Sequence, residues 1–310
     1  MNDQAASLRA RMAERLSAQA AAGANGHARP LLSLAIASGK GGVGKSHLAI
    51  GLAYALSALG ARVVVIDVDF GFANVDVLLG KRPRATLADV AYGRAALHEA
   101  VTAVTDGFDM VAGIADAEGL KEGDERALVG RLIAALSTLD ARYDFVLFDF
   151  GAGLHRAAQR LLQAVDRVLI VLNSDVAAMV DAYALYKWLV QNGQANVSLV
   201  ANRVPDASGG GALIERFARI AERYLGQRPH GLGVIREDAH LLHAARHGRS
   251  PFPLPAKAVA ARDLAQLAVR LVLLARAGGA AGDHKDPPGR SLSRQGMRGV
   301  IARLRERLFS

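Results

Sequence analysis

The stretch LLSLAIASGKGGVGKSHLAIGLAYALSALG, residues 31–60, decides the fold of this chain. It starts with a continuous apolar run of the kind found in strands that are buried on both faces. A glycine-rich loop follows at residues 38–44, and a helical pattern then runs to Gly60, a residue type that commonly ends helices. A strand, a glycine loop and a helix in this order predict a phosphate-binding loop of the Walker A type.

The loop SGKGGVGKS, residues 38–46, has the residue types that phosphate binding requires. Glycine has no side chain to obstruct a phosphate, so backbone N–H groups and the positive end of the new helix can face the anion. Lys45 is expected to neutralise the β- and γ-phosphates of a nucleotide, and Ser46 to ligate Mg²⁺ through its hydroxyl. The expected nucleotide contacts in this loop are Gly39, Lys40, Gly41, Gly42, Val43, Gly44, Lys45, Ser46 and His47.

Outward from this loop, short apolar runs alternate with helical patterns up to about residue 276. This alternation predicts the α/β class: a single P-loop NTPase domain whose mostly parallel sheet has helices on both faces. Strands are expected at residues 31–38, 61–67, 108–113, 143–150, 166–173, 196–204 and 231–235, and the expected helices include 45–59, 124–139, 155–165 and 176–192.

The two ends of the chain differ in composition from this domain. Residues 1–30 are expected to form a partner-binding segment and an Ala-rich tether, and the nucleotide-binding domain then spans residues 31–276. Residues 277–293 include GAAGDHKDPPG, which is rich in Gly, Pro and charge and predicts a flexible linker. Residues 294–310 are expected to form an amphipathic helix.

Composition excludes several classes of protein. Of the 310 residues, 51% are hydrophobic and 22% are charged, which excludes wholesale disorder. The chain has no cysteine, so it forms no disulfide, thiolate zinc site or cysteine-ligated iron–sulfur cluster. No apolar run is long enough to span a membrane and no signal-peptide pattern is present, so a cytoplasmic protein is expected.

The net charge of +9 is concentrated at the two ends. Residues 1–30 carry a net +2 and residues 276–310 a net +5, so the body of the chain keeps only +2. A large nucleic-acid surface on the folded body is therefore not expected, and any attraction to anionic partners is expected in the terminal segments.

Carboxylates follow two of the predicted buried strands. Asp67 and Asp69 end the second strand, and Asp149 ends the strand at 143–150. Ligands of open α/β sheets bind at the carboxyl ends of the strands, so these side chains are expected beside the phosphates. Asp149 is expected to hold Mg²⁺ through water, as a Walker B aspartate does, while Gly151 and Gly153 let the following loop sense the γ-phosphate.

The extra lysine of the loop, Lys40, together with both acidic motifs, resembles the deviant Walker A family that includes ParA, MinD and the flagellar-number regulators called FlhG, FleN or YlxH. The resemblance covers about residues 31–276. It implies that Lys40 reaches the partner's ATP in a nucleotide-sandwich homodimer and that Asp69 orients the attacking water. It also implies switch-ordering roles for Asp67 and Asn74, and an adenine contact for Asn202.

Some positions depart from that family's pattern. Phe150 stands where Thr or Ser is common, which removes a hydroxyl contact at that point. The sequence GAG at residues 151–153 resembles the flagellar branch more than the division-site branch, where Pro is usual. Asp175 lies where relatives have a Pro-Glu pair, and no role is transferred to it. Related ATPases that use cysteine-bound iron–sulfur clusters or zinc are excluded, because the chain has no cysteine.

Both terminal segments carry helical patterns. In residues 294–310, five apolar side chains fall within an arc of about 100° and arginines lie beside or opposite them, which predicts an interfacial helix for anionic lipid of the inner membrane. These apolar residues are Met297, Val300, Ile301, Leu304 and Leu308. A helix that docks this stripe on the protein's own core or on a partner protein stays the alternative. At the other end, DQAxxLR resembles the partner motif of FlhG proteins and consists of Asp3, Gln4, Ala5, Leu8 and Arg9.

The expected function is that of an ATP- and Mg²⁺-dependent switch that dimerises, associates peripherally with the cytoplasmic face of the membrane and regulates flagellar number or placement. The resemblance implies FlhF GTPase, a flagellar transcription activator and basal-body switch proteins as partners. Three alternatives stay open: a MinD-type division-site ATPase, a ParA-type DNA-segregation ATPase, and a scaffold that binds nucleotide with little turnover.

Overall fold

The computed structural model describes residues 32–69, 73–113, 131, 135, 139, 142–151, 156–247 and 250–280. Several predictions lie outside these residues: the partner motif at the N-terminus, the amphipathic helix at 294–310, Gly153, and most of the helix expected at 124–139. These remain predictions from the sequence.

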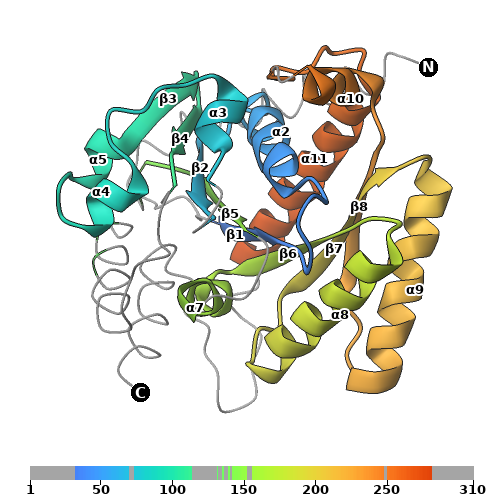
Figure 1. Ribbon diagram of the computed structural model, residues 1–310. Coiled ribbons are helices and arrows are strands. Elements are labelled where there is room, and N and C mark those ends of the chain that lie inside the picture. The colour runs from blue at the N-terminus through green and yellow to red at the C-terminus, as the bar shows by residue number, and fades with distance from the viewer. Residues whose placement is uncertain are drawn as a thin grey trace.

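One eight-stranded sheet forms the centre of the described structure, with the strand order β3-β4-β2-β5-β1-β6-β7-β8 (Figure 1). Every neighbouring pair is parallel except β3 and β4. The strands are β1 (Leu32–Ala37), β2 (Val63–Val68), β3 (Val101–Thr105), β4 (Phe108–Val111), β5 (Phe145–Phe150), β6 (Arg167–Leu172), β7 (Val197–Val204) and β8 (His230–Arg236). The seven strands expected from the sequence are confirmed with small shifts at their ends.

Strand β3 was not expected from the sequence. It is an edge strand with no residue in the buried class, and it pairs antiparallel with β4 through a β-bulge between Ala103 and Thr105. Its pattern VTAVT is short and only partly apolar, so it lacks the continuous apolar character by which the central strands were recognised.

Helices cover both faces of the sheet, as predicted. One hydrophobic cluster packs α2 and α11 against one face, and a second packs α4, α7, α8 and α9 against the other (Figure 1). The helices are α2 (Lys45–Ser57), α3 (Val75–Leu79), α4 (Leu87–Ala91), α5 (Leu97–Ala100), α7 (Arg156–Ala164), α8 (Val176–Gln191), α9 (Ala207–Leu225), α10 (Ala239–Arg246) and α11 (Val259–Ala280).

Helix α11 runs four residues beyond the expected end of the domain at 276. The first residues of the expected linker, 277–280, are therefore helical. In the part of the chain that the structure describes, no helix combines the length and apolarity that crossing a membrane requires.

Strand order explains why the predicted site residues meet. β1 lies between β5 and β6, and β2 lies on the far side of β5, so the carboxyl ends of β1, β2 and β5 adjoin one another. In the sheet register Asp149 is paired with Ile36 of β1 and with Asp67 of β2. The phosphate loop and both acidic motifs therefore share one edge of the sheet.

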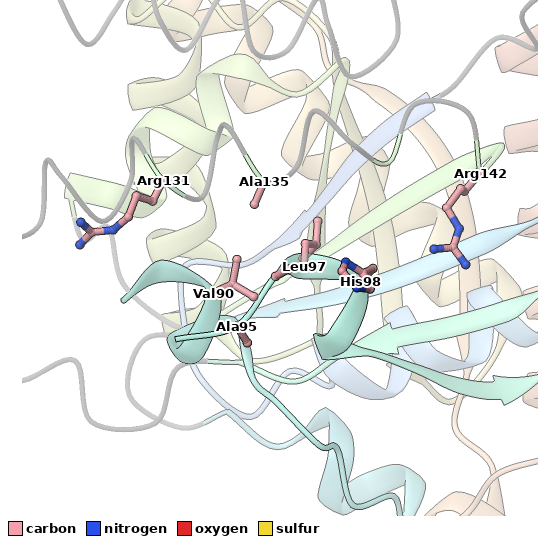
Figure 2. Close-up of a pocket in the computed structure, with 8 residues that line it drawn as sticks. Val90, Ala95, Leu97, His98, Arg131, Ala135 and Arg142 are labelled. Carbon is pink, nitrogen blue, oxygen red and sulfur yellow. The ribbon is translucent and has the colours of Figure 1, made fainter. Parts of the chain in front are cut away.

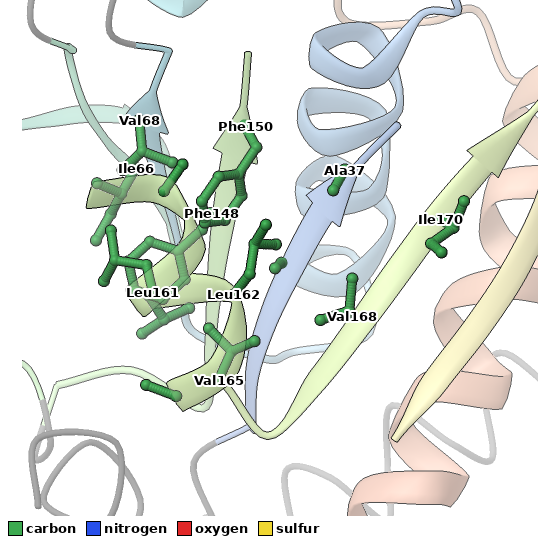
Figure 3. Packing of buried hydrophobic residues seen from close by; sticks show 14 of the residues in the cluster. Ala37, Ile66, Val68, Phe148, Phe150, Leu161, Leu162, Val165, Val168 and Ile170 are labelled. Atoms are coloured by element: carbon green, nitrogen blue, oxygen red, sulfur yellow. The ribbon is translucent and has the colours of Figure 1, made fainter. Parts of the chain in front are cut away.

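Phe150 occupies a core position. It is 3% exposed and lies in the cluster beneath α7, near Val68, Phe148 and Leu161 (Figure 3). The residue after Asp149 thus packs into the core of this chain, where its large apolar side chain contributes buried surface.

Candidate functional site

The phosphate loop joins β1 to α2 with two glycines in the left-handed region, Gly42 at φ 77° and Gly44 at φ 90°. Gly44 is the N-cap of α2 and provides no side-chain cap, so the first N–H groups of the helix are available to an anion. Gly39 lies against the backbone of α8, where an added Cβ would come 2.0 Å from the carbonyl carbon of Asp181. Only glycine fits this approach between loop and helix.

Lys45 points into the loop from the first residue of α2. Its side chain is buried, and its Nζ donates a hydrogen bond of 3.0 Å to Ser38 Oγ. Burial lowers the pKa of Lys45, while the nearby charges of Asp149 and Asp69 raise it. A buried ammonium beside two carboxylates can neutralise phosphate oxygens, which is the role predicted for it.

Asp149 is a buried acid of the site, at 1% exposed. Its Oδ1 is the one buried side-chain polar atom in the described residues without a hydrogen-bond partner, and the carboxylate also accepts a hydrogen bond from Ser46. Burial raises the pKa of Asp149 to about 8, and the charge of Asp67 adds to the increase. An orphaned buried oxygen next to a serine hydroxyl fits the Mg²⁺ site expected from the sequence.

Asp67 has a structural role in the first switch segment. Its buried carboxylate accepts hydrogen bonds from the backbone N–H groups of Asp69 (3.0 Å), Asn74 (2.8 Å) and Val75 (3.1 Å). Burial raises its pKa to about 6, while these backbone hydrogen bonds lower it. Asp67 therefore ties the two ends of the segment together, and Asn74 is held through its backbone, since its side chain forms no cap on α3.

Asp69 and Gly151 bring the two switch segments into contact. An added Cβ on Gly151 would come 2.4 Å from Asp69 Oδ1, so glycine is what leaves room for this carboxylate. Asp69 is partly exposed and its charge acts on both Lys45 and Asp149. The structure thus places the predicted catalytic carboxylate beside the loop lysine and the expected Mg²⁺ ligand.

Asn202 contacts the phosphate loop. Its Nδ2 donates a 2.8 Å hydrogen bond to the carbonyl oxygen of Val43, and an added Cβ on Gly44 would come 2.6 Å from the same nitrogen. Arg203 was not expected at the site; its guanidinium donates to the carbonyl oxygen of Gly42 at 3.2 Å, and its φ of 56° is unusual for a residue other than glycine. The predicted adenine contact of Asn202 stays a prediction.

Lys40 is directed away from the loop's own interior. Its Nζ lies 2.9 Å from Asp175 Oδ2, and both side chains are 45% exposed. Asp175 is also the N-cap of α8, because its Oδ1 accepts hydrogen bonds from the N–H groups of Ala177 and Ala178. The hydrogen bond from Lys40 is the main cause that lowers the pKa of Asp175. Sequence reasoning gave Asp175 no role, although an Asp before a helix is a recognisable cap.

His47 lies one residue beyond Ser46 in the first turn of α2. Its ring is partly buried and tilted against Phe252, with ring centroids 6.1 Å apart. Burial lowers the pKa of His47, and the charge of Arg203 lowers it further. The ring therefore packs against Phe252, and only the position of His47 at the start of α2 supports the predicted nucleotide contact.

A second concave surface lies elsewhere in the fold. This groove of about 460 Å³ is formed by α4, α5 and residues 131, 135 and 142, and none of its lining residues belongs to the phosphate loop (Figure 2). Its wall is mainly apolar, with Val90, Ala95 and Leu97 lying between Arg131 at one end and Arg142 at the other. It contributes no group to the chemistry described above.

Comparisons with known proteins agree with this geometry. A family model described as the CobQ/CobB/MinD/ParA nucleotide binding domain matches residues 34–252. The antiactivator FleN of Pseudomonas aeruginosa is 32% identical over 245 residues, which cover 78% of this chain and 87% of FleN. The flagellum site-determining protein YlxH of Helicobacter pylori is 34% identical over 210 residues, which cover 67% of this chain and 70% of YlxH.

Solved structures resemble the fold over the same region. The cell-division ATPase MinD of Pyrococcus furiosus aligns with a TM-score of 0.65 at 25% identity, covering 78% of this chain and 99% of MinD. MinD of Pyrococcus horikoshii, whose structure is a complex with Mg-ADP, aligns with a TM-score of 0.64 at 24% identity, covering 79% and 97%. The chain therefore belongs to the MinD/ParA family of nucleotide-binding proteins, in the branch of the flagellar regulators FleN and YlxH.

Proposed function

We propose that this chain is a Mg²⁺-dependent ATPase that acts as a dimerising switch and regulates the number or placement of flagella. Similarity to FleN, named as an antiactivator, and to YlxH, named as flagellum site-determining, supports the flagellar role. The switch is proposed from the position of Lys40. Its ammonium lies at an exposed edge beside α8, whereas Lys45 occupies the interior of the loop.

The proposed reaction is attack of water on the γ-phosphorus of ATP, with cleavage of the bond to the bridging β–γ oxygen and release of ADP and phosphate. Ser46 and Asp149 would hold Mg²⁺, which would neutralise charge on the phosphates. Asp69 orients the water and accepts its proton, and its contact with Gly151 fixes the carboxylate for this role. Lys45 stabilises the negative charge that develops on the leaving ADP.

ATP-dependent dimerisation is proposed from the edge around Lys40. On α8, Val176 and Val180 lie one turn apart and are 72% and 63% exposed, so an apolar strip begins beside the Lys40–Asp175 pair. A second protomer that faces this edge would cover the strip, and each Lys40 could then exchange Asp175 for the partner's phosphates.

Light scattering after size-exclusion chromatography tests this proposal, with Asp69→Ala in every variant so that ATP persists. Lys40→Ala should still bind ATP and remain monomeric, whereas Lys45→Ala should bind ATP poorly. Lys187→Ala, a lysine farther along α8, is the matched control and should dimerise normally. A Lys40→Ala protein that dimerises with ATP would remove the main support of the proposed switch.

Membrane association is proposed for residues 294–310, which lie outside the described residues. A single short basic helix binds anionic lipid weakly, but two helices on one dimer bind far better because the second is held at a high effective concentration. Sedimentation with anionic liposomes should retain the ATP-bound protein and release Leu304→Glu, while Leu304→Met should bind as the unmodified chain does. Equal binding of Leu304→Glu would exclude the lipid role.

The terminal partner segment is also a proposal. The DQAxxLR motif in residues 1–30 is proposed to bind FlhF, with a flagellar transcription activator and basal-body switch proteins as further partners. Leu8→Glu should abolish binding to purified FlhF and leave ATP turnover unchanged. Binding of FlhF that survives this change would place its contact elsewhere on the chain.

A further inference from the structure

A short exposed surface lies on the segment that follows the first switch. Helix α3 carries Val77, which is 72% exposed, and the chain then turns at Gly80 and exposes Arg82 and Arg84. The Lys81 N–H donates a hydrogen bond of 2.9 Å to the carbonyl oxygen of Asp76. This bond folds the basic stretch that follows Gly80 back beside α3. We call Val77, Arg82 and Arg84 the α3 surface.

The net charge of this region is positive. Residues 74–84 contain Lys81, Arg82 and Arg84 against Asp76 alone. Lys81 is engaged with the edge strand, because its Nζ lies 3.4 Å from the carbonyl oxygen of Val104. Arg82 and Arg84 form no ion pair within the described part of the chain, so both guanidinium groups are available to an outside carboxylate.

The α3 surface is attached to the nucleotide site through Asp67. This buried carboxylate accepts hydrogen bonds from the backbone N–H groups of Asn74 and Val75 at the start of α3, and Val75 itself is fully buried. The same carboxylate accepts the N–H of Asp69. Asp67 therefore joins the backbone of Asp69 to the start of α3, the helix that carries Val77 and that follows β2 (Figure 1).

We propose that the α3 surface docks an acidic, apolar segment of a partner protein, and that the nucleotide state of the site sets the position of this surface. Carboxylates of the partner pair with Arg82 and Arg84, and an apolar side chain covers Val77. Nucleic acid is a poorer fit, because the exposed Val77 gains nothing from a phosphate backbone. The nucleotide dependence rests on the proposed function, whereas the docking itself does not.

Selection of random dodecapeptides by phage display tests the surface without assuming a partner sequence. The full-length chain serves as bait, and peptides that also bind the triple variant Val77→Ser, Arg82→Glu, Arg84→Glu are removed. The recovered peptides should be negatively charged and contain a large apolar residue. Failure to recover such peptides, or recovery of neutral or basic ones, would overturn the proposal.

Fluorescence anisotropy with one recovered peptide then assigns the contacts. Val77→Ser and Arg82→Glu should each weaken binding by about tenfold, and Arg219→Glu, an exposed arginine on α9, should leave it unchanged. All variants should bind Mg-ATP as the unmodified chain does. If the α3 variants instead abolish ATP-dependent dimerisation, liposome binding or retention on DNA while peptide binding persists, the surface belongs to another contact and the proposal is wrong.

Comparing nucleotide states separates this inference from the proposed function. The peptide should bind with different affinities to the Mg-ADP form and to the Mg-ATP form of Asp69→Ala. Equal affinities with intact docking would overturn the coupling through Asp67 and keep the surface. Absence of ATP binding would overturn the proposed switch even if docking is found.

Discussion

The ammonium of Lys40 lies 2.9 Å from a carboxylate oxygen of Asp175 and joins the phosphate loop to the first turn of α8. The carboxylate also caps this helix, so its position is fixed by the backbone of α8. Because both side chains are 45% exposed, the ion pair is weak and solvent competes with it. Lys40 is thus held on its own protomer by a contact that a partner's phosphates can replace.

Removing the charge of Asp175 should favour the dimer. Asp175→Asn keeps a side chain that caps α8 but loses the ion pair, so Lys40 no longer has to leave a carboxylate before it reaches the partner. The ATP-bound dimer should form with a dissociation constant lower by a few-fold, measured by analytical ultracentrifugation. A weaker dimer would mean that Asp175 is itself needed across the interface.

Gly151→Ala should impair hydrolysis with little effect on the fold. The new methyl group displaces the Asp69 carboxylate, and a displaced catalytic group commonly costs about a hundredfold in rate. Steady-state phosphate release should fall accordingly, while the melting temperature and ATP affinity stay close to those of the unmodified chain. Gly211→Ala is the matched control, because no atom lies within 4 Å of its added Cβ. Normal turnover of Gly151→Ala would separate Asp69 from the chemistry.

Asn202→Ala should loosen the phosphate loop. The lost hydrogen bond to Val43 is worth about 1 kcal/mol, which corresponds to about fivefold in affinity. Calorimetric titration should show this decrease equally for ATP and for inorganic tripolyphosphate, since the loop binds both. A decrease confined to ATP would show that Asn202 contacts the base and that its bond to the loop is unimportant for binding.

Asp149→Asn should stabilise the chain when nucleotide and Mg²⁺ are absent. The carboxyl has a pKa of about 8 in the fold and 3.8 in its unperturbed state, so the native state holds more protons between these values and its free energy of unfolding falls as pH rises. Asparagine does not ionise, so the free energy of unfolding of the variant does not fall in this way. Its advantage in melting temperature should grow from about pH 5 to about pH 8 and disappear when Mg-ATP is added. An advantage that shrinks as pH rises would contradict the burial of an ionisable Asp149.

The sequence was sufficient for the parts of the fold that have continuous patterns. Strands β1, β2 and β5 are uninterrupted apolar runs, and their common edge followed from parallel pairing, so the meeting of Lys45, Asp67 and Asp149 could be predicted. Edge strand β3 could not, because a half-exposed strand has no such pattern. The exact helix boundaries, such as the extension of α11 to Ala280, depend on packing that the pattern does not contain.

The contacts that were hardest to predict from the sequence are those between segments far apart in the chain. Asp175 lies 135 residues from Lys40, and Arg203 lies 161 residues from Gly42. Neither pairing has a local signal, because both depend on the order of the sheet, in which β6 pairs with β1 and β7 pairs with β6. The different roles of Asp67 and Asp69 followed from the family resemblance and not from a local pattern. The structure shows Asp67 bonded to the backbone of Asn74, and Asp69 close to Gly151.

The most direct test of the account is a count of flagella and minicells in the source bacterium after deletion of this gene and complementation with single variants. If the chain is a flagellar switch, deletion should alter flagellar number or position without producing minicells. The unmodified gene and Lys187→Ala should restore the normal pattern, whereas Lys40→Ala and Asp69→Ala should not. Minicells with normal flagella, or full restoration by both site variants, would contradict the proposed flagellar role.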